Sequence, residues 1–177
     1  VYRLPGVIAS IAVIGQLACT VAAITGYFGG FNSFTLTLPG MAGIILSIGM
    51  GVDANVITSE RIKEEIRAGR TIDGALQAGN KGSFWAIFDG NITTIIVAVI
   101  LMGVFGPPDS FFATILKPFM FMFGASATGA VYSFGYTLLV GVILNFVMGV
   151  FASRVMLNSI SRFKIFRKPW LYGGASK

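Results

Sequence analysis

The sequence predicts an all-α membrane protein, and three observations lead to this fold class. The 177-residue chain is 55% hydrophobic and only 11% charged, whereas a soluble domain carries about a quarter charged residues. Its apolar residues gather in long runs, and a run of about 18 or more near-uncharged residues can cross a bilayer. The basic residues lie in blocks beside these runs, which is how membrane proteins mark their cytoplasmic side.

Four apolar runs are long enough to be transmembrane spans, at about 7–28, 37–58, 84–106 and 131–153. We expect each span to be an α-helix, because lipid offers the backbone no hydrogen-bond partners. The chain opens on Val1 rather than Met, and no signal peptide is visible. This beginning suggests a piece of a longer protein.

The Lys and Arg residues predict how the spans are oriented. They flank the second and third spans and the end of the fourth, at Arg61, Lys63, Arg67, Arg70, Lys81, Arg154, Arg162, Lys164, Arg167 and Lys168. The positive-inside rule therefore places both termini and the 59–82 loop in the cytoplasm.

The 59–82 loop has the signals of two short amphipathic helices lying near the membrane. Gly69 is a plausible C-cap for the first helix, and Thr71 can N-cap the second. A solvated hairpin that only fixes topology and a partner-binding role remain open for this loop. The basic tail, 158–177, alternates basic and aromatic residues, which favours anchoring to anionic membrane lipid.

The connection at 107–130 contains apolar segments that are too short to span a bilayer. Pro107, Pro108 and Pro118 interrupt it, and proline breaks helices. We predict an apolar insertion on the exterior side, folded as a re-entrant or interfacial segment.

Composition argues against several other classes. The chain has no histidine and a single cysteine, Cys19, so no internal disulfide can form, and we expect no metal and no cofactor. The net charge is +6, but no basic face interleaved with aromatics supports nucleic-acid binding.

Only two acids fall within the spans, Asp53 and Asp89. A charge near the centre of a membrane helix costs about 2.5–3.5 kcal/mol, so such a residue is a functional candidate by default. Each lies five residues from the predicted cytoplasmic end of its span, which is about 7–8 Å of helix. We therefore expect the two carboxylates at one depth. A carboxylate tuned by its surroundings can bind and release a proton, which makes both acids candidates for proton coupling.

Small residues occupy two opposite sides of the second span. A helical turn of 100° per residue places Ala42 and Gly49 with Asp53, and Gly40, Gly43, Ser47 and Gly51 on the other side. Small residues let membrane helices approach closely. This pattern predicts a central helix with neighbours on both sides, and hence an Asp53 buried in protein.

Polar residues accompany both acids. Asn55 follows Asp53, and Asn91, Thr93 and Thr94 follow Asp89. They are candidates to support a carboxylate or to line a hydrated path, and simple polar contacts between helices explain them equally well. The spans contain no Lys or Arg, so a cation that tunes Asp53 would have to come from elsewhere.

Several motifs resemble those of SecD, a bacterial protein-export membrane protein of the SecD/SecF family within the RND superfamily. They are Gly51-Val52-Asp53-Ala54-Asn55-Val56, Ser59-Glu60-Arg61-Ile62-Lys63-Glu64-Glu65, Phe88-Asp89-Gly90-Asn91-Ile92-Thr93-Thr94, Tyr2-Arg3-Leu4-Pro5-Gly6 and Leu38-Pro39-Gly40-Met41-Ala42-Gly43-Ile44. The resemblance covers nearly the whole chain. Gly90, where the family often has Ala, and the 107–130 insertion depart from the usual pattern.

The resemblance implies an RND-type transmembrane helix bundle, half of a twelve-helix assembly in the bacterial cytoplasmic membrane. The chain would be the C-terminal transmembrane part, without the first helix and the large exterior domain. Such assemblies use the proton-motive force to help move secreted polypeptides, so the implied partners are a SecF-type subunit, the SecYEG translocon, YajC and the translocating preprotein. The family's proton-coupling aspartate matches Asp53, and its proposed partner is an arginine of the SecF half. Asp89 stands where SecF-like chains carry that arginine, so its role follows less directly.

Two alternatives remain beside protein export. An RND-type exporter of lipid or small molecules would share the helix bundle. An intramembrane aspartyl protease would also place two aspartates at one depth, but its motifs occur in the reverse order and its Pro-Ala-Leu motif is absent. We therefore expect no enzymatic activity.

Overall fold

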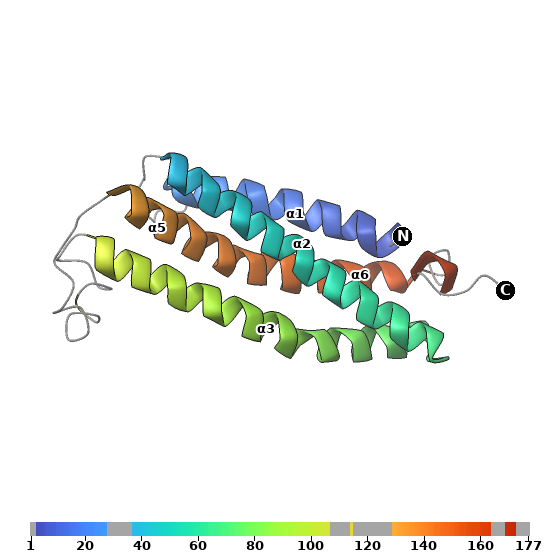
Figure 1. Ribbon diagram of the computed structural model, residues 1–177. Helices are drawn as coiled ribbons and strands as arrows, with labels where there is room; N and C mark the ends of the chain where they lie inside the picture. Colours follow the sequence, from blue (N-terminus) through green and yellow to red (C-terminus); the bar gives the residue numbers. More distant parts are fainter. Residues whose placement is uncertain (1–2, 28–36, 107–113, 115–128, 164–168, 173–177) are drawn as a thin grey trace.

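The computed structural model describes residues 3–27, 37–106, 114, 129–163 and 169–172. Within these ranges it contains four helices that are long and apolar enough to cross a membrane. The four helices lie side by side as one bundle (Figure 1). The predicted all-α fold class is confirmed.

The helices are longer than the predicted spans. They are α1 (Arg3–Ile24), α2 (Leu38–Arg67), α3 (Ile72–Phe105) and α5 (Gly129–Leu144); α5 continues through a π-helical segment, η1 (Asn145–Ala152), into α6 (Ser153–Ser161). Side-chain caps fix two of the starts. The hydroxyl of Thr37 accepts from the Gly40 N–H at 3.2 Å, and that of Thr71 accepts from the Gly74 N–H at 3.3 Å.

The predicted pair of separate loop helices is wrong. No helix breaker follows the second span, so α2 runs unbroken to Arg67, and α3 already begins at Ile72. The two predicted ends are nevertheless in place, because Gly69 turns the chain at φ +89° and Thr71 caps α3. Residues 59–82 therefore form the ends of two membrane helices joined by a tight turn.

The α2–α3 turn, the start of α1 and the end of α6 lie at the same end of the bundle, here called the basic end (Figure 1). An apolar core of seven buried residues holds this end together: Ile8, Ile62, Ile66, Ala75, Leu76, Leu157 and Tyr172. Tyr172 belongs to a short 3₁₀ turn, η3 (Pro169–Tyr172), and the guanidinium of Arg3 lies 3.2 Å from the ring centroid of Trp170. The described part of the tail thus packs against the bundle, while its predicted lipid anchoring stays a prediction.

Helix α2 contacts α1, α3, α5 and η1, as a central helix should. The face of α2 that carries small residues is packed against other helices, because Gly40, Gly43, Ser47 and Gly51 are all buried. Gly43 lies so close to α5 that an added Cβ would stand 3.0 Å from the Phe134 carbonyl oxygen. The other predicted small face differs, because Ala42, Gly49 and Asp53 are exposed.

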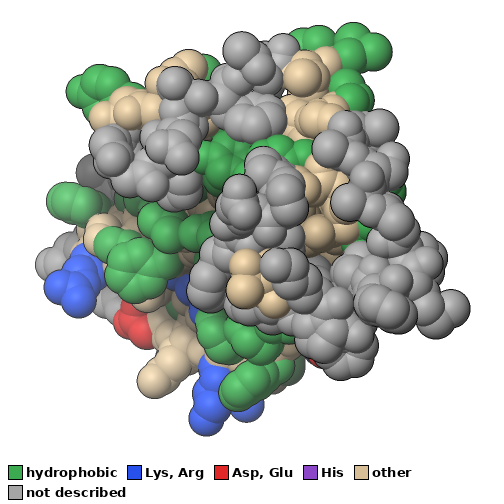
Figure 2. Space-filling model, turned by 90° about the vertical axis from the view of Figure 1, so that its left-hand side faces the viewer, with side chains coloured by type: hydrophobic (Ala, Val, Ile, Leu, Met, Phe, Trp, Pro, Cys, Tyr) green, Lys and Arg blue, Asp and Glu red, His purple; other side chains and the backbone are tan. Residues whose placement is uncertain are grey.

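Large apolar side chains are exposed on every long helix, for example Ile14, Ile45, Ile96 and Phe151. Exposure of this kind suits a surface that faces lipid rather than water. Figure 2 looks onto the opposite end of the bundle, where the described side chains in view are mainly hydrophobic and the few basic ones lie at its lower left and lower margin. The predicted 107–130 insertion falls outside the described residues except for Thr114, Gly129 and Ala130.

Candidate functional site

Asp53 lies on the exposed side of α2, at the edge of a groove of about 250 Å³ between α2 and α3. The groove is lined by Met50, Asp53, Ala54, Ile57, Ala86, Ile87, Gly90, Asn91 and Thr94. The described helices of this chain therefore do not bury Asp53, and its predicted burial in protein stays a prediction. Helical phase correctly separated the two faces of α2, but it could not show that the described helices cover only one of them.

The packing of α2 on α3 fixes the level of the two aspartates. The hydroxyls of Thr58 and Ser83 are 3.1 Å apart, and the Thr94 hydroxyl donates to the Met50 sulfur at 3.5 Å. Between these contacts, the antiparallel register puts Asp53 opposite residues 89–91. The register agrees with the predicted common depth of Asp53 and Asp89.

The two carboxylates lie at a similar level but do not share a site. Asp89 is exposed on α3 and is not among the residues that line the Asp53 groove. Within the described ranges, neither carboxylate has a hydrogen bond or an ion pair. The geometry therefore presents Asp53 on an open face and leaves both acids available to a partner.

The predicted supporting polar residues divide into two groups. Asn91 and Thr94 line the Asp53 groove, and Asn91 is buried, with its amide donating to the Ile87 carbonyl at 2.7 Å. Asn55 is buried elsewhere, donating to the Gly51 carbonyl at 2.9 Å, and Thr93 is exposed.

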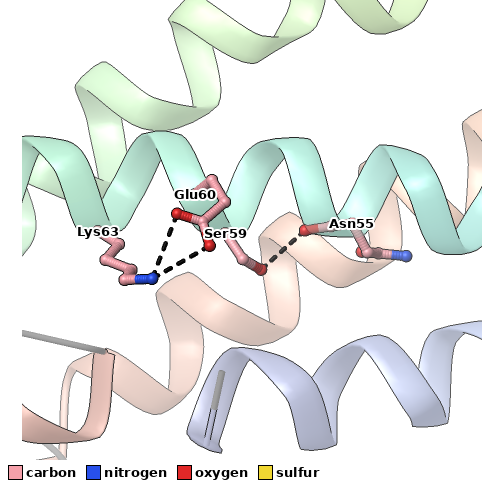
Figure 3. Close-up of polar contacts among 4 residues, drawn as sticks. All are labelled: Asn55, Ser59, Glu60 and Lys63. Carbon is pink, nitrogen blue, oxygen red and sulfur yellow. Dashed lines mark hydrogen bonds and ion pairs between the residues drawn. The ribbon is translucent and has the colours of Figure 1, made fainter. Parts of the chain in front are cut away.

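Asn55 begins a polar row that follows α2 toward the basic end (Figure 3). The Ser59 hydroxyl donates to the Asn55 carbonyl at 2.7 Å, and the Lys63 ammonium donates to both Glu60 carboxylate oxygens at 3.1 and 3.3 Å. The four residues form two separate pairs along the same helix, Asn55 with Ser59 and Glu60 with Lys63. This row therefore carries polar groups along α2 without an unpaired charge.

A buried amide cluster, formed by Gln16, Asn91 and Asn145, lies behind the Asp53 groove. The Gln16 amide donates to the Ser47 carbonyl at 3.1 Å, and the Asn145 amide donates to the Asn91 side-chain oxygen at 3.4 Å. The side-chain oxygens of Gln16 and Asn145 have no hydrogen-bond partner among the described residues. Because Asn91 also lines the groove, it joins the groove to the interior of the bundle.

Two glycines make room for the amide cluster. A Cβ on Gly51 would collide with the Gln16 side-chain oxygen, and one on Gly149 would collide with that of Asn145. Gly149 lies in η1, the π-helical segment that begins at Asn145, and π-helical turns are frequent at functional sites. Among the predicted packing glycines, Gly40, Gly43 and Gly51 make close contacts, whereas Gly49 meets nothing within 4 Å. Gly49 therefore has no packing neighbour among the described residues, and its packing role stays a prediction.

Sequence reasoning did not single out Gln16 or Asn145. A signal was present, because each is the only side-chain amide in its apolar span. Polar side chains within a membrane helix generally face the bundle interior. What the sequence could not give is that residues 16, 91 and 145 meet.

Arg154, the residue just after the predicted fourth span, reaches into the bundle. It lies in α6, half-buried, and donates to the Ser83 hydroxyl at 3.3 Å. Ser83 is paired with Thr58, which follows Asp53 by five residues, or about 7.5 Å of helix. Arg154 thus lies nearer the basic end than Asp53 and makes no contact with it.

No group of three or more metal-ligating side chains occurs among the described residues. The amide cluster contains no charged side chain, and the acids near it, Asp53 and Asp89, do not gather into a group that could hold a metal. What the arrangement offers is a carboxylate at the surface of a helix bundle with polar groups leading inward from it.

The chain is similar to curated proteins over nearly its whole length. It is 39% identical over 176 residues to the protein translocase subunit SecD of Leptotrichia buccalis, and 40% identical over 171 residues to the protein translocase subunit SecDF of Bacillus subtilis. These alignments cover 99% and 96% of the chain. This chain is a homologue of SecD.

Solved structures agree with the SecD homology. A crystal structure of SecDF in a super-membrane-facing form matches 88% of the chain with a TM-score of 0.65 and 31% identity. A crystal structure of SecDF from Thermus thermophilus, described as a translocon-associated membrane protein, matches 89% with a TM-score of 0.61 and 29% identity. The fold is that of the SecDF transmembrane region. No family model matches the chain.

The chain spans 37% of the Leptotrichia SecD and 20% of the Bacillus SecDF. It therefore corresponds to a membrane-embedded part of these relatives. Multiple membrane passes in a bacterial membrane follow from the four apolar helices and the SecD homology.

Proposed function

We propose that this chain is the membrane part of a protein-export subunit in the bacterial cytoplasmic membrane. It couples the movement of protons, or of sodium ions, to the translocation of secreted polypeptides. The observation that carries this proposal is the placement of Asp53. It is a carboxylate within a predicted span, on an open groove, in a chain that resembles protein translocase subunits over nearly its whole length.

Asp53 has the surroundings that a coupling residue needs. It lies on a face of α2 that no described helix covers, so a second membrane subunit can reach it. An arginine from a SecF-type subunit would stabilise the charged carboxylate, and protonation would remove that attraction. Binding and release of a proton would then alter how the two subunits pack.

The ion gradient is sufficient for such a step. Moving one elementary charge across the membrane yields about 2.3 kcal/mol per 100 mV. The buried amide cluster lies behind Asp53 and connects to its groove through Asn91. We propose Asn91 and Thr94 as the groove residues that position water or the partner side chain, with Asn55, Thr93 and Asp89 in supporting roles.

The orientation and partners of the chain belong to the same proposal. The basic end faces the cytoplasm, as the positive-inside rule expects. The SecF-type subunit covers the Asp53 face, and the pair acts beside the SecYEG translocon, with YajC as a further component and the preprotein as cargo. No catalytic step on a substrate is involved.

Replacement of Asp53 in the full-length complex tests the proposal. Asp53→Asn keeps the size of the side chain but removes its titration, and we expect it to abolish the part of preprotein translocation that depends on the ion gradient. Asp53→Glu should retain part of it. The measurement is protease protection of a preprotein in inverted membrane vesicles, with the proton or the sodium gradient collapsed separately.

Glu64→Gln is the matched control, because Glu64 is an exposed acid at the basic end that pairs with Arg61 at 3.2 Å. It should translocate like the unaltered protein. Gradient-dependent translocation that survives in Asp53→Asn would rule out the proposed coupling role.

A further inference from the structure

A second groove, of about 700 Å³, opens between α3 and α6 at the basic end and takes no part in the proposed coupling. It is lined by Asp73, Leu76, Gln77, Asn80, Arg154, Asn158, Ser161 and Arg162. All but one of these residues are polar or charged. At a helix end beside the bilayer surface, such a groove is suited to a ligand that is polar and membrane-bound.

Arg154 forms the floor of this groove. One terminal nitrogen of its guanidinium donates to Ser83 at 3.3 Å, while its Nε is buried and has no partner among the described residues. No acid within the described ranges forms an ion pair with it. A half-buried guanidinium in this state keeps several N–H donors for an anion, and its planar fork matches phosphate in particular.

The rest of the lining favours the same ligand charge. Arg162 adds a second cation at the rim, against Asp73 as the single acid of the lining. Gln77, Asn80 and Asn158 carry amide N–H donors, whereas the Ser161 hydroxyl already donates to the Asn158 carbonyl at 2.9 Å. The groove is therefore electropositive and rich in donors, which is the character of a phosphate-binding site.

An apolar shelf adjoins the arginine. The guanidinium carbon of Arg154 lies 5.4 Å from the ring centroid of Phe84, and Phe84 and Phe88 each contact Trp85 edge-on, with ring centroids 5.7 and 6.0 Å apart. Trp85 is 70% exposed. These aromatics stand where the predicted third span begins, at residue 84, and exposed aromatics at the edge of a span lie at the level of the lipid headgroups. A free phosphate would have no use for this shelf, whereas the acyl chains of a lipid would cover it.

We propose that this groove binds the phosphate headgroup of an anionic phospholipid, with Arg154 as the main ligand, Arg162 as the second, and the acyl chains against Phe84, Trp85 and Phe88. Basic pockets between membrane helices recognise anionic headgroups in this way. The site depends on the membrane location of the chain and not on its role in export. A bound phospholipid would stabilise the contact between α6 and α3 at the bilayer surface.

Binding of defined lipids to the delipidated full-length protein tests this site. Phosphatidylglycerol and phosphatidylcholine are titrated separately into the purified protein in detergent, and bound lipid is counted by native mass spectrometry. We expect selective binding of phosphatidylglycerol. Arg154→Gln should weaken it about tenfold or more, because hydrogen bonds to a charged group are lost.

Two further variants and a soluble competitor separate the alternatives. Arg162→Gln changes an exposed side chain at the end of α6, and it should weaken phosphatidylglycerol binding by a smaller factor. Arg67→Gln removes an exposed arginine of α2 outside the groove and should leave binding unchanged. Glycerol 3-phosphate at millimolar concentration should not displace the lipid.

Three results would overturn the proposal. They are equal affinity for phosphatidylglycerol and phosphatidylcholine, unchanged phosphatidylglycerol binding in both groove variants, and displacement by glycerol 3-phosphate. The last result would assign the groove to a soluble phosphate compound instead.

Discussion

Gly43 and Gly49 lie on opposite sides of α2 and differ in what surrounds them. A Cβ on Gly43 would collide with the Thr137 hydroxyl and stand 3.0 and 3.2 Å from backbone atoms of Phe134 and Leu138, whereas one on Gly49 would meet nothing within 4 Å. Backbone atoms of a packed helix cannot step aside as a flexible side chain can. Close approach of helices is a main source of stability in membrane bundles.

We predict that Gly43→Ala destabilises the protein by about 1–3 kcal/mol, because α2 and α5 must separate to admit the methyl group. Gly49→Ala is the control and should be neutral or stabilising by up to about 1 kcal/mol, since alanine favours the helix. Thermal unfolding of the full-length protein in detergent measures both. Equal melting temperatures for the two variants would contradict the close packing of α2 on α5.

The amide cluster belongs to the same scale. Gln16 and Asn145 are fully buried, and unpaired polar groups in a membrane interior are costly. Their side-chain oxygens lie close to Gly51 and Gly149, because these glycines have no side chain to fill that space. The amides and the glycines can each be seen in the sequence, but their contact with one another depends on how the helices pack.

The turn between α2 and α3 is decided within a few residues. Gly69 adopts φ +89°, a conformation that costs a residue with a Cβ about 1–2 kcal/mol. Its N–H donates to the Ile66 carbonyl at 3.1 Å and that of Arg70 to the Glu65 carbonyl at 3.2 Å, so these bonds end α2. Arg70 also pairs with Glu65 at 2.8 Å.

We predict that Gly69→Ala lowers the free energy of unfolding by about 1–2 kcal/mol through this backbone strain. Gly82→Ala provides the comparison, because Gly82 is an exposed glycine within α3 with no atom within 4 Å of an added Cβ. It should gain up to about 1 kcal/mol from helix propensity. Urea titration followed by circular dichroism gives both values, and a stabilised Gly69→Ala protein would show that the turn does not need glycine.

For the molecule as a whole, the uncovered face of α2 matters most. Ala42, Gly49 and Asp53 are exposed there, and the described chain offers no helix to cover them. A small-residue face with a carboxylate is an unfavourable surface to leave in lipid. It suits a closely packed neighbour, which the proposed function assigns to a SecF-type subunit.

We predict that Gly49→Cys, in a Cys19→Ser background, forms cross-links to that subunit. The two subunits are expressed together, and the membranes are then treated with a cysteine-reactive bifunctional reagent. Ile14→Cys is the control, because Ile14 is 67% exposed on α1, whose buried side faces α2 through Gln16 and Gly51. Cross-linked species on a denaturing gel give the readout. Cross-linking from Ile14 but not from Gly49 would place the partner on another face.

The sequence by itself determined the class of the protein, its helices and its two intramembrane acids. Apolar length and missing backbone partners leave little choice but helices, and a 3.6-residue period correctly sorted α2 into its two faces. The caps Thr37, Gly69 and Thr71 are local features and could be found locally. Burial of Asp53 could not, because helical phase says where a side chain points and not whether another helix stands there.

Only the tertiary structure decided which residues meet. It brought the side chains of Gln16 and Asn145 together beside Gly51 and joined Asn145 to Asn91. It also placed Arg154 in a groove, beside Ser83 and Phe84. The physical reason is the same in each case. Spacing along one helix is fixed by backbone hydrogen bonds, whereas contacts between helices depend on how closely small residues such as Gly43 and Gly51 allow them to pack.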